Sequence, residues 1–267
     1  MPSAAPLPLA LLLGLAMAQS ARAGEAACWF ENGAVVVSAM VGGVAGDYIL
    51  DTGTAHTVLA ETQAQGAGFA ETALSLEVRI AGLTLSDRPV VVQDIDARSH
   101  AFPTPIAGVI GADILADLVL EVSFAPCRVG FYPAGHAPGF RVETTLPIGV
   151  EGGVPTLEAT VADGLNTQAG RFVLATGADT AVRIDDQQAQ VPGSRRSPQD
   201  LLTYGAARPR LRALSMADRL WEELPSGLVA HADLPDGVLG MVGTPTLSAW
   251  RMRFDLPGHS LGLTRPR

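Results

Sequence analysis

The stretch Tyr48-Ile49-Leu50-Asp51-Thr52-Gly53-Thr54-Ala55 decides the fold that we predict for this chain. It is typical of an apolar strand that ends in a carboxylate, followed by Thr and by a Gly that permits a tight turn. The chain contains one imperfect copy, Phe172-Val173-Leu174-Ala175-Thr176-Gly177-Ala178-Asp179. The copy has Ala175 where the first stretch has Asp51, and every functional expectation depends on this difference.

Other landmarks repeat in the same order after the two stretches. Gly108-Val109-Ile110-Gly111 matches Gly237-Val238-Leu239-Gly240, and Glu121-Val122-Ser123-Phe124 matches Arg251-Met252-Arg253-Phe254. Three collinear matches predict a duplicated lobe. With residues 133–139 as a linker, we expect one lobe over residues 24–135 and a second over residues 140–267.

Short apolar runs broken by Gly, Pro and Asp predict an all-β protein with only short helices. In the first half, the runs expected to form strands are residues 35–37, 48–50, 76–80, 89–92, 109–110 and 118–120. Short helices are expected over residues 113–118 and 244–250, with Asp113 and Thr244 as N-caps and Pro245 in the first helical position.

The two halves differ in length at one place. Equivalent hairpins are expected over residues 76–92 and 211–229, and the second half has 11 more residues between its turn and its hairpin. The extra length includes Tyr204 and Gly205. We predict that these two residues form the tip of a flap over a substrate cleft.

Residues 1–23 are typical of an export signal. An apolar core over residues 7–18 precedes Ala21-Arg22-Ala23, an A-x-A-type cleavage site. The core is shorter than the roughly 20 residues that cross a bilayer. We therefore expect a cleaved signal and an exported protein, periplasmic or secreted, with no membrane span.

Composition argues against some classes of partner, and the two cysteines and five histidines limit the disulfides and metal sites that the chain can form. The net charge is −9 and all 18 basic residues are Arg, so no basic face for nucleic acid or anionic membrane is expected. Cys28 and Cys127 could form one disulfide or remain two thiols. No cofactor is expected, and His231-Ala232-Asp233 lacks the third ligand of a metal site.

A carboxylate on such a turn is half of a two-carboxylate site. Two carboxylates about 3 Å apart cannot both ionise, so they share a proton and can hold a water between an acid and a base. Gly53 lets backbone N–H groups approach Asp51. We predict that Thr52 and Thr176 face each other and connect the two turns through hydroxyl-to-backbone hydrogen bonds.

The Asp51 stretch, followed by Val109-Ile110-Gly111-Ala112-Asp113-Ile114-Leu115, resembles the aspartic peptidases and is most similar to the retropepsin-like family. In that family an Asp-Thr-Gly turn precedes a hydrophobic-hydrophobic-Gly segment. The resemblance implies two β-lobes fused as in pepsin, facing each other across a cleft, and endopeptidase activity on peptides or unfolded proteins.

The resemblance also implies roles for individual residues. Asp51 would be catalytic and Ala175 marks the position of the lost second aspartate, with support from the turn residues Thr52, Gly53, Thr176 and Gly177. The residues expected to line the cleft are Thr54, Ala55, Ala178, Asp179, Tyr204 and Gly205. Asp179 stands where retroviral relatives carry an Asp that holds the substrate backbone, and His56 is expected at the rim.

Two functions remain open. In the first, the chain is an endopeptidase in which Asp51 activates a water, alone or with Asp51 of a second molecule. The second lobe already occupies the face that a partner would need, so a monomer is expected rather than a homodimer. In the second, the chain is catalytically silent and its cleft binds an extended peptide as an added strand. The loss of a carboxylate at Ala175 favours silence or very low activity.

Overall fold

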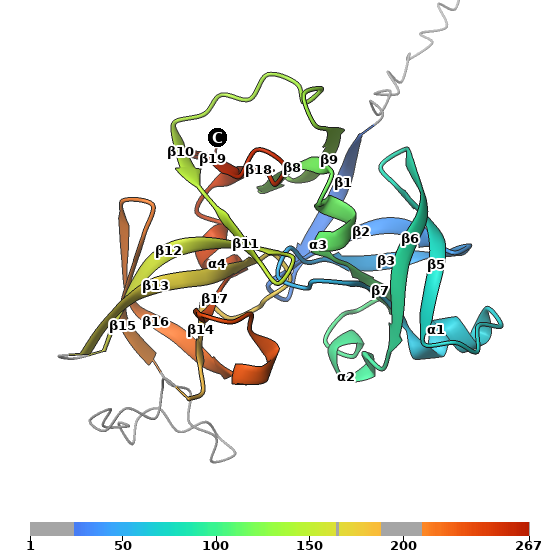
Figure 1. Ribbon diagram of the computed structural model, residues 1–267, viewed down its shortest axis with the longest axis horizontal. Coiled ribbons are helices and arrows are strands. Elements are labelled where there is room, and N and C mark those ends of the chain that lie inside the picture. The colour runs from blue at the N-terminus through green and yellow to red at the C-terminus, as the bar shows by residue number, and fades with distance from the viewer. Residues whose placement is uncertain (1–23, 164–165, 188–209, 267) are drawn as a thin grey trace, which may run out of the picture.

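The computed structural model describes residues 24–163, 166–187 and 210–266. Strands dominate these residues and form two sheets, in agreement with the predicted all-β class (Figure 1). No helix in this part of the chain is long and apolar enough to cross a membrane. The predicted signal, residues 1–23, and the predicted flap tip, Tyr204 and Gly205, lie outside the described residues.

Six strands of the first half close into a barrel. Their order is β2-β3-β7-β4-β6-β5, and β5 pairs back with β2. All the predicted runs from residue 35 to residue 110 fall within these strands, whose bounds are β2 Ala34–Val41, β3 Val44–Leu50, β4 Thr57–Ala60, β5 Ala73–Ile80, β6 Leu83–Gln93 and β7 Ile106–Ile110.

A second barrel repeats this order in the second half. Its strands run β12-β13-β17-β14-β16-β15, with β15 paired back to β12, and the short strand β11 (Gly149–Glu151) extends the sheet beyond β12. The bounds are β12 Val154–Asp163, β13 Asn166–Ala175, β14 Val182–Asp185, β15 Arg210–Met216, β16 Arg219–Val229 and β17 Val238–Gly243. The two halves therefore share one topology, as the duplication predicted.

The register of the strands corrects one of the sequence matches. Next to the first turn, Leu50 pairs with Ile110, so Gly111 follows the paired strand end. Next to the second turn, Leu174 pairs with Val242 and Ala175 with Gly243. The equivalent of Gly111 is thus Gly243 and not Gly240. The mismatch arose because residues 237–243 contain two consecutive copies of the pattern, each an apolar pair between two glycines. Only the strand pairing shows which copy is the equivalent.

A third group of strands joins the two halves. The order β10-β19-β18-β8-β9-β1 continues directly into β2, so both halves contribute to one shared sheet (Figure 1). Val122 of β8 pairs with Met252 of β18, the residue that the sequence match had made its equivalent. The bounds are β1 Glu25–Glu31, β8 Leu118–Phe124, β9 Cys127–Pro133, β10 Thr144–Pro147, β18 Arg251–Asp255 and β19 Ser260–Thr264.

A disulfide also ties the N-terminal strand into this sheet. Cys28 of β1 is bonded to Cys127 of β9, with a Cα–Cα distance of 5.0 Å. The bond resolves the two possibilities that the sequence left open, because no free cysteine remains.

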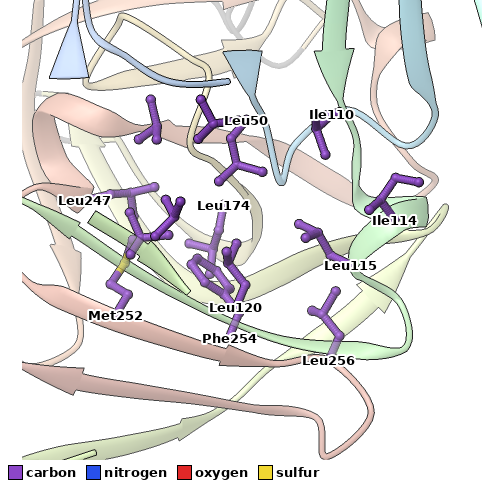
Figure 2. Close-up of a cluster of buried hydrophobic side chains, with 14 of the residues drawn as sticks. Leu50, Ile110, Ile114, Leu115, Leu120, Leu174, Leu247, Met252, Phe254 and Leu256 are labelled. Carbon is purple, nitrogen blue, oxygen red and sulfur yellow. The ribbon is translucent and has the colours of Figure 1, made fainter. Parts of the chain in front are cut away.

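The main hydrophobic core extends through both barrels and also fills the space between the turns and the shared sheet. Leu50 and Leu174, which precede the two turn positions, point toward Leu120 and Phe254 of the shared sheet (Figure 2). All four side chains are fully buried. Burying such a side chain contributes about 1.5–3 kcal/mol relative to leaving it exposed, so the core holds both turns on a fixed base.

The helices are short, and their starts differ from the prediction. They are α1 (Glu61–Gly66), α2 (Asp96–Ser99), α3 (Ala112–Leu115), α4 (Thr244–Leu247) and the 3-10 helix η3 (His231–Asp233). Gly111 and Gly243 occupy the N-cap positions of α3 and α4. Asp113 instead accepts hydrogen bonds from the backbone and hydroxyl of Thr57, at 2.9 and 2.8 Å. The Thr244 hydroxyl donates to the carbonyls of Gly33 and Ala178.

Candidate functional site at the paired turns

The two turns follow the ends of β3 and β13 and lie against each other. Asp51 N donates to Ile110 O at 3.0 Å, which extends the pairing of β3 with β7 by one residue. Gly111 allows the segment after the first turn to pack closely, because a Cβ there would lie 2.6 Å from the carbonyl oxygen of His56. The equivalent Gly243 is confined even more tightly, because a Cβ there would lie 2.1 Å from Thr180 O and 2.6 Å from Ala178 O.

The predicted hydrogen bonds between the turns are present. Thr52 N donates to Thr176 Oγ1 at 3.0 Å, and Thr176 N donates to Thr52 Oγ1 at 3.3 Å. Each hydroxyl in turn donates to the opposite strand, Thr176 Oγ1 to Leu50 O at 2.8 Å and Thr52 Oγ1 to Leu174 O. Both threonines are fully buried, so four hydrogen bonds shielded from water hold the two turns in register.

The carboxylate of Asp51 accepts hydrogen bonds from both turns. Its Oδ1 accepts from Gly53 N at 2.9 Å and from Gly177 N at 3.1 Å. Its Oδ2 accepts from the Thr54 hydroxyl at 2.9 Å. The Asp51 residue is only 6% exposed. The carboxylate is therefore held in one orientation by groups of both turns.

Ala175 lies on the second turn, against Gly53 of the first turn, and has an apolar environment. A Cβ on Gly53 would be only 2.6 Å from the Ala175 methyl carbon, so the two turns touch at this point. Ala175 is buried in a cluster with Ala112, Val173 and Ala178. The position that would hold a second carboxylate is therefore occupied by a methyl group packed among apolar side chains.

Arg98 is a site residue that the sequence did not reveal. It belongs to α2, and its Nη2 lies 3.4 Å from Asp51 Oδ2 and donates to Gly177 O at 2.7 Å. Its side chain is 36% exposed, whereas that of Asp51 is 8% exposed. The guanidinium thus joins the two turns and balances the charge of Asp51. A single Arg in a segment between strands carries no sequence signal for such a contact.

The other predicted residues surround the turns without adding a second acid. Ala55 is partly exposed and Ala178 is buried. Asp179 is exposed, and its Oδ1 accepts from Arg183 at 2.8 Å rather than from a turn residue. His56 is exposed, as expected for a rim position.

A separate ion pair lies at the end of β14. The Asp185 carboxylate is 3% exposed and its Oδ2 lies 2.8 Å from Nδ1 of His231, which is half exposed. The hydrogen bond and charge of Asp185 raise the pKa of His231. Burial acts to raise the pKa of Asp185, but the bonds from His231 and from Gln187 N outweigh it and lower that pKa overall. In the described chain, no three His, Cys, Asp or Glu side chains are placed to bind a metal.

This pair gives the free energy of unfolding a defined pH dependence. The contribution of His231 is complete below its ordinary pKa of 6.5 and is lost as the pH rises through the raised folded pKa. The contribution of Asp185 is complete above its ordinary pKa of 3.8 and is lost as the pH falls through the lowered one. His231→Gln should therefore destabilise most between these two ordinary values and least at alkaline pH, measured by urea unfolding, with exposed His136→Gln as the control. A pH-independent difference would contradict the ion pair.

Comparison with solved structures places the fold. The chain matches the crystal structure of an aspartic proteinase from Irpex lacteus with a TM-score of 0.53 and 13% identity, over 91% of this chain and 97% of that one. No family model matches the sequence, and no curated protein does. Because 395 solved chains match while no family model and no curated protein does, the similarity resides in the backbone arrangement. The chain has the two-lobed, all-β fold seen in pepsin-like aspartic proteinases.

Proposed function

We propose that this protein is an exported relative of the aspartic peptidases that binds extended polypeptide between its two halves without hydrolysing it. One observation carries the proposal: opposite Asp51, which is paired with Arg98, the second turn presents only the Ala175 methyl group. A two-carboxylate mechanism needs one proton shared between two acids. Here Asp51 has the Arg98 guanidinium as its neighbour, and the turn opposite supplies no second carboxylate.

The preserved turn geometry supports a retained binding role. The four hydrogen bonds between Thr52 and Thr176 and the adjacent strands are present although the second acid is absent. An extended peptide could add to an exposed backbone edge, gaining main-chain hydrogen bonds that require no catalytic group.

A low-activity endopeptidase is the second candidate, because the intact Asp51 turn favours it. A partner molecule would have to supply the second acid, and the second half of the chain occupies the face opposite Asp51. Sedimentation of the purified protein distinguishes catalysis by one copy of Asp51 from catalysis by two copies in a dimer. A strict monomer removes the route through two copies of Asp51.

The proposal is tested with fluorescently labelled, unfolded casein as the probe. We expect saturable binding to the wild type and no release of peptides between about pH 3 and pH 7, the range of paired acids. Ala55→Trp, which places a large ring beside the Asp51 turn, should weaken binding by about tenfold, equivalent to about 1.4 kcal/mol. Ala70→Trp, an exposed position away from the turns, is the matched control.

Two results would overturn the proposal. Peptide release that disappears in Asp51→Asn would show that the chain is a working peptidase. Absence of casein binding by a folded wild type would show that the paired turns no longer serve a polypeptide ligand. The melting temperature of each variant, measured alongside, separates a loss of binding from a loss of folding.

A further inference from the structure

A pocket of about 440 Å³ lies on the outer face of the shared sheet. Side chains alternate along these strands, so Leu120 and Phe254 face the core while Glu121 of β8 and Arg251 of β18 face outward and line the pocket. Among the described residues that line it, none belongs to either turn. Its volume is in the range of pockets that bind small molecules.

The acidic residues of this pocket are already satisfied within the protein. Glu121 is buried and accepts hydrogen bonds from Arg251, at 2.8 Å, and from Arg253. The Tyr132 hydroxyl donates to Glu25 Oε1 at 2.9 Å. Burial and the neighbouring Glu25 raise the pKa of Tyr132, so its hydroxyl keeps the proton that it donates.

A third carboxylate, Glu143, is also engaged. It accepts from the Thr264 hydroxyl at 3.2 Å and lies 3.8 Å from Arg265. Each acidic residue of the lining therefore has a partner that reduces its effect on an incoming ligand.

Two arginines of the lining remain uncompensated. The side chains of Arg128 and Arg141 have no hydrogen-bond or ion-pair partner in the part of the chain that the structure describes. Both side chains are exposed at the pocket, in a protein whose net charge is −9. The guanidinium group presents a rigid fork of N–H donors that matches a carboxylate or phosphate. Two such groups at one pocket favour a ligand with more than one negative charge.

The backbone of both arginines is held in place. Arg128 follows the disulfide-bonded Cys127, and it pairs with Ser123 on one side and with Ala27 on the other. Arg141 follows Phe140, in the segment that arches from β9 to β10 (Figure 1). A ligand would therefore find the backbone already ordered, which lowers the entropic cost of binding.

The Phe140 ring anchors the segment between β9 and β10, which contains Arg141. The guanidinium carbons of Arg251 and Arg253 lie 4.9 and 4.7 Å from its centroid, within the distance of a cation–π contact. Arg253 also donates to Pro138 O. These contacts join the segment to the outer face of the shared sheet and keep Arg141 at the pocket.

We propose that this pocket binds a small, multiply charged oxyanion, a polycarboxylate or a phosphate, with Arg128 and Arg141 as the ligand-binding side chains. The site lies on the outer face of the shared sheet and is independent of polypeptide binding at the turns. Because the pocket is formed only in the folded chain, a bound anion would also stabilise the folded protein by mass action.

Isothermal titration calorimetry tests the site with two probes, citrate and inorganic phosphate, each compared with sodium chloride at equal ionic strength. We expect one saturable site for at least one probe, and Arg128→Gln/Arg141→Gln should weaken it by about tenfold or more, as for loss of charge-assisted hydrogen bonds. Arg79→Gln/Arg212→Gln, with the same loss of charge at exposed positions of β5 and β15, should leave it unchanged.

The outcomes separate the alternatives. Preference for citrate identifies a carboxylate ligand, and preference for phosphate identifies a phosphate ligand. Equal weakening by both double variants, or binding abolished by sodium chloride alone, would overturn the site in favour of a general charge effect. Failure of a folded wild type to bind either probe would overturn it as well.

Discussion

Ala175→Asp combined with Arg98→Gln is expected to release peptides from unfolded casein at acidic pH, whereas Ala175→Asp alone is expected to remain nearly silent. The new carboxylate would arrive beside Gly53, opposite Asp51, on a turn that already has the required hydrogen bonds. A cation beside two acids opposes the sharing of one proton between them, and the Arg98 guanidinium lies 3.4 Å from Asp51. Removing it should let the two acids titrate as a coupled pair.

The rate of peptide release should rise by about 100-fold or more over the single variant, in the range of general acid–base catalysis. Ala175→Asp combined with Arg79→Gln is the matched control, because it removes an exposed arginine far from the turns. Asp51→Asn added to the active variant should abolish release. Stability should fall in every variant with Ala175→Asp, since a carboxylate enters an apolar cluster.

Two outcomes would change this account. If Ala175→Asp is as active as the double variant, Arg98 does not restrain Asp51. If both variants fold but neither releases peptides at any pH, the site lacks more than a second carboxylate and is restrained by more than the charge of Arg98.

Thr176→Val is expected to lower the free energy of unfolding by about 2–4 kcal/mol, because it leaves two buried backbone groups without partners. Those groups are Leu50 O, which accepts from the Thr176 hydroxyl, and Thr52 N, which donates to it. Valine has the same shape as threonine, so packing is retained while the hydrogen bonds are lost. Urea unfolding followed by circular dichroism gives the difference.

Thr180→Val serves as the control for this substitution. Its hydroxyl donates to the exposed carboxylate of Asp179, and its loss should change stability by less than about 0.5 kcal/mol. Thr52→Val should resemble Thr176→Val, and the double variant should cost less than the sum, since both residues belong to one network. Additive losses, or equal losses for Thr176→Val and Thr180→Val, would show that the two turns are held by packing alone.

Local sequence patterns were sufficient to predict six strands of the first half and the hydrogen bonds between the turns. The stretch ending in Leu50-Asp51 and its copy ending in Leu174-Ala175 both have an apolar run before a Thr-Gly turn, a pattern that describes one strand and its end. Once two copies face each other, Thr52 and Thr176 are placed symmetrically. The hydrogen bonds then follow from the short reach of the hydroxyl group.

The starts of the helices were predicted one or two residues late for a physical reason. Asp113 and Thr244 have the side chains of good N-caps, and the sequence favours them for that role. In the folded chain these side chains hydrogen-bond to Thr57 and to Gly33, which are distant in sequence. Tertiary partners outweigh the local preference, and Gly111 and Gly243 take the cap positions because only glycine fits there.

The sequence by itself determined the all-β class, the duplication and the absence of a carboxylate at Ala175, because these depend on residue identity and local periodicity. Only the tertiary structure decided that Gly243 is the equivalent of Gly111, that Arg98 pairs with Asp51, and that Arg128 and Arg141 meet at one pocket. Each of these depends on segments far apart in the chain being brought together. Their distances follow from barrel closure and strand register, which residue order alone does not specify.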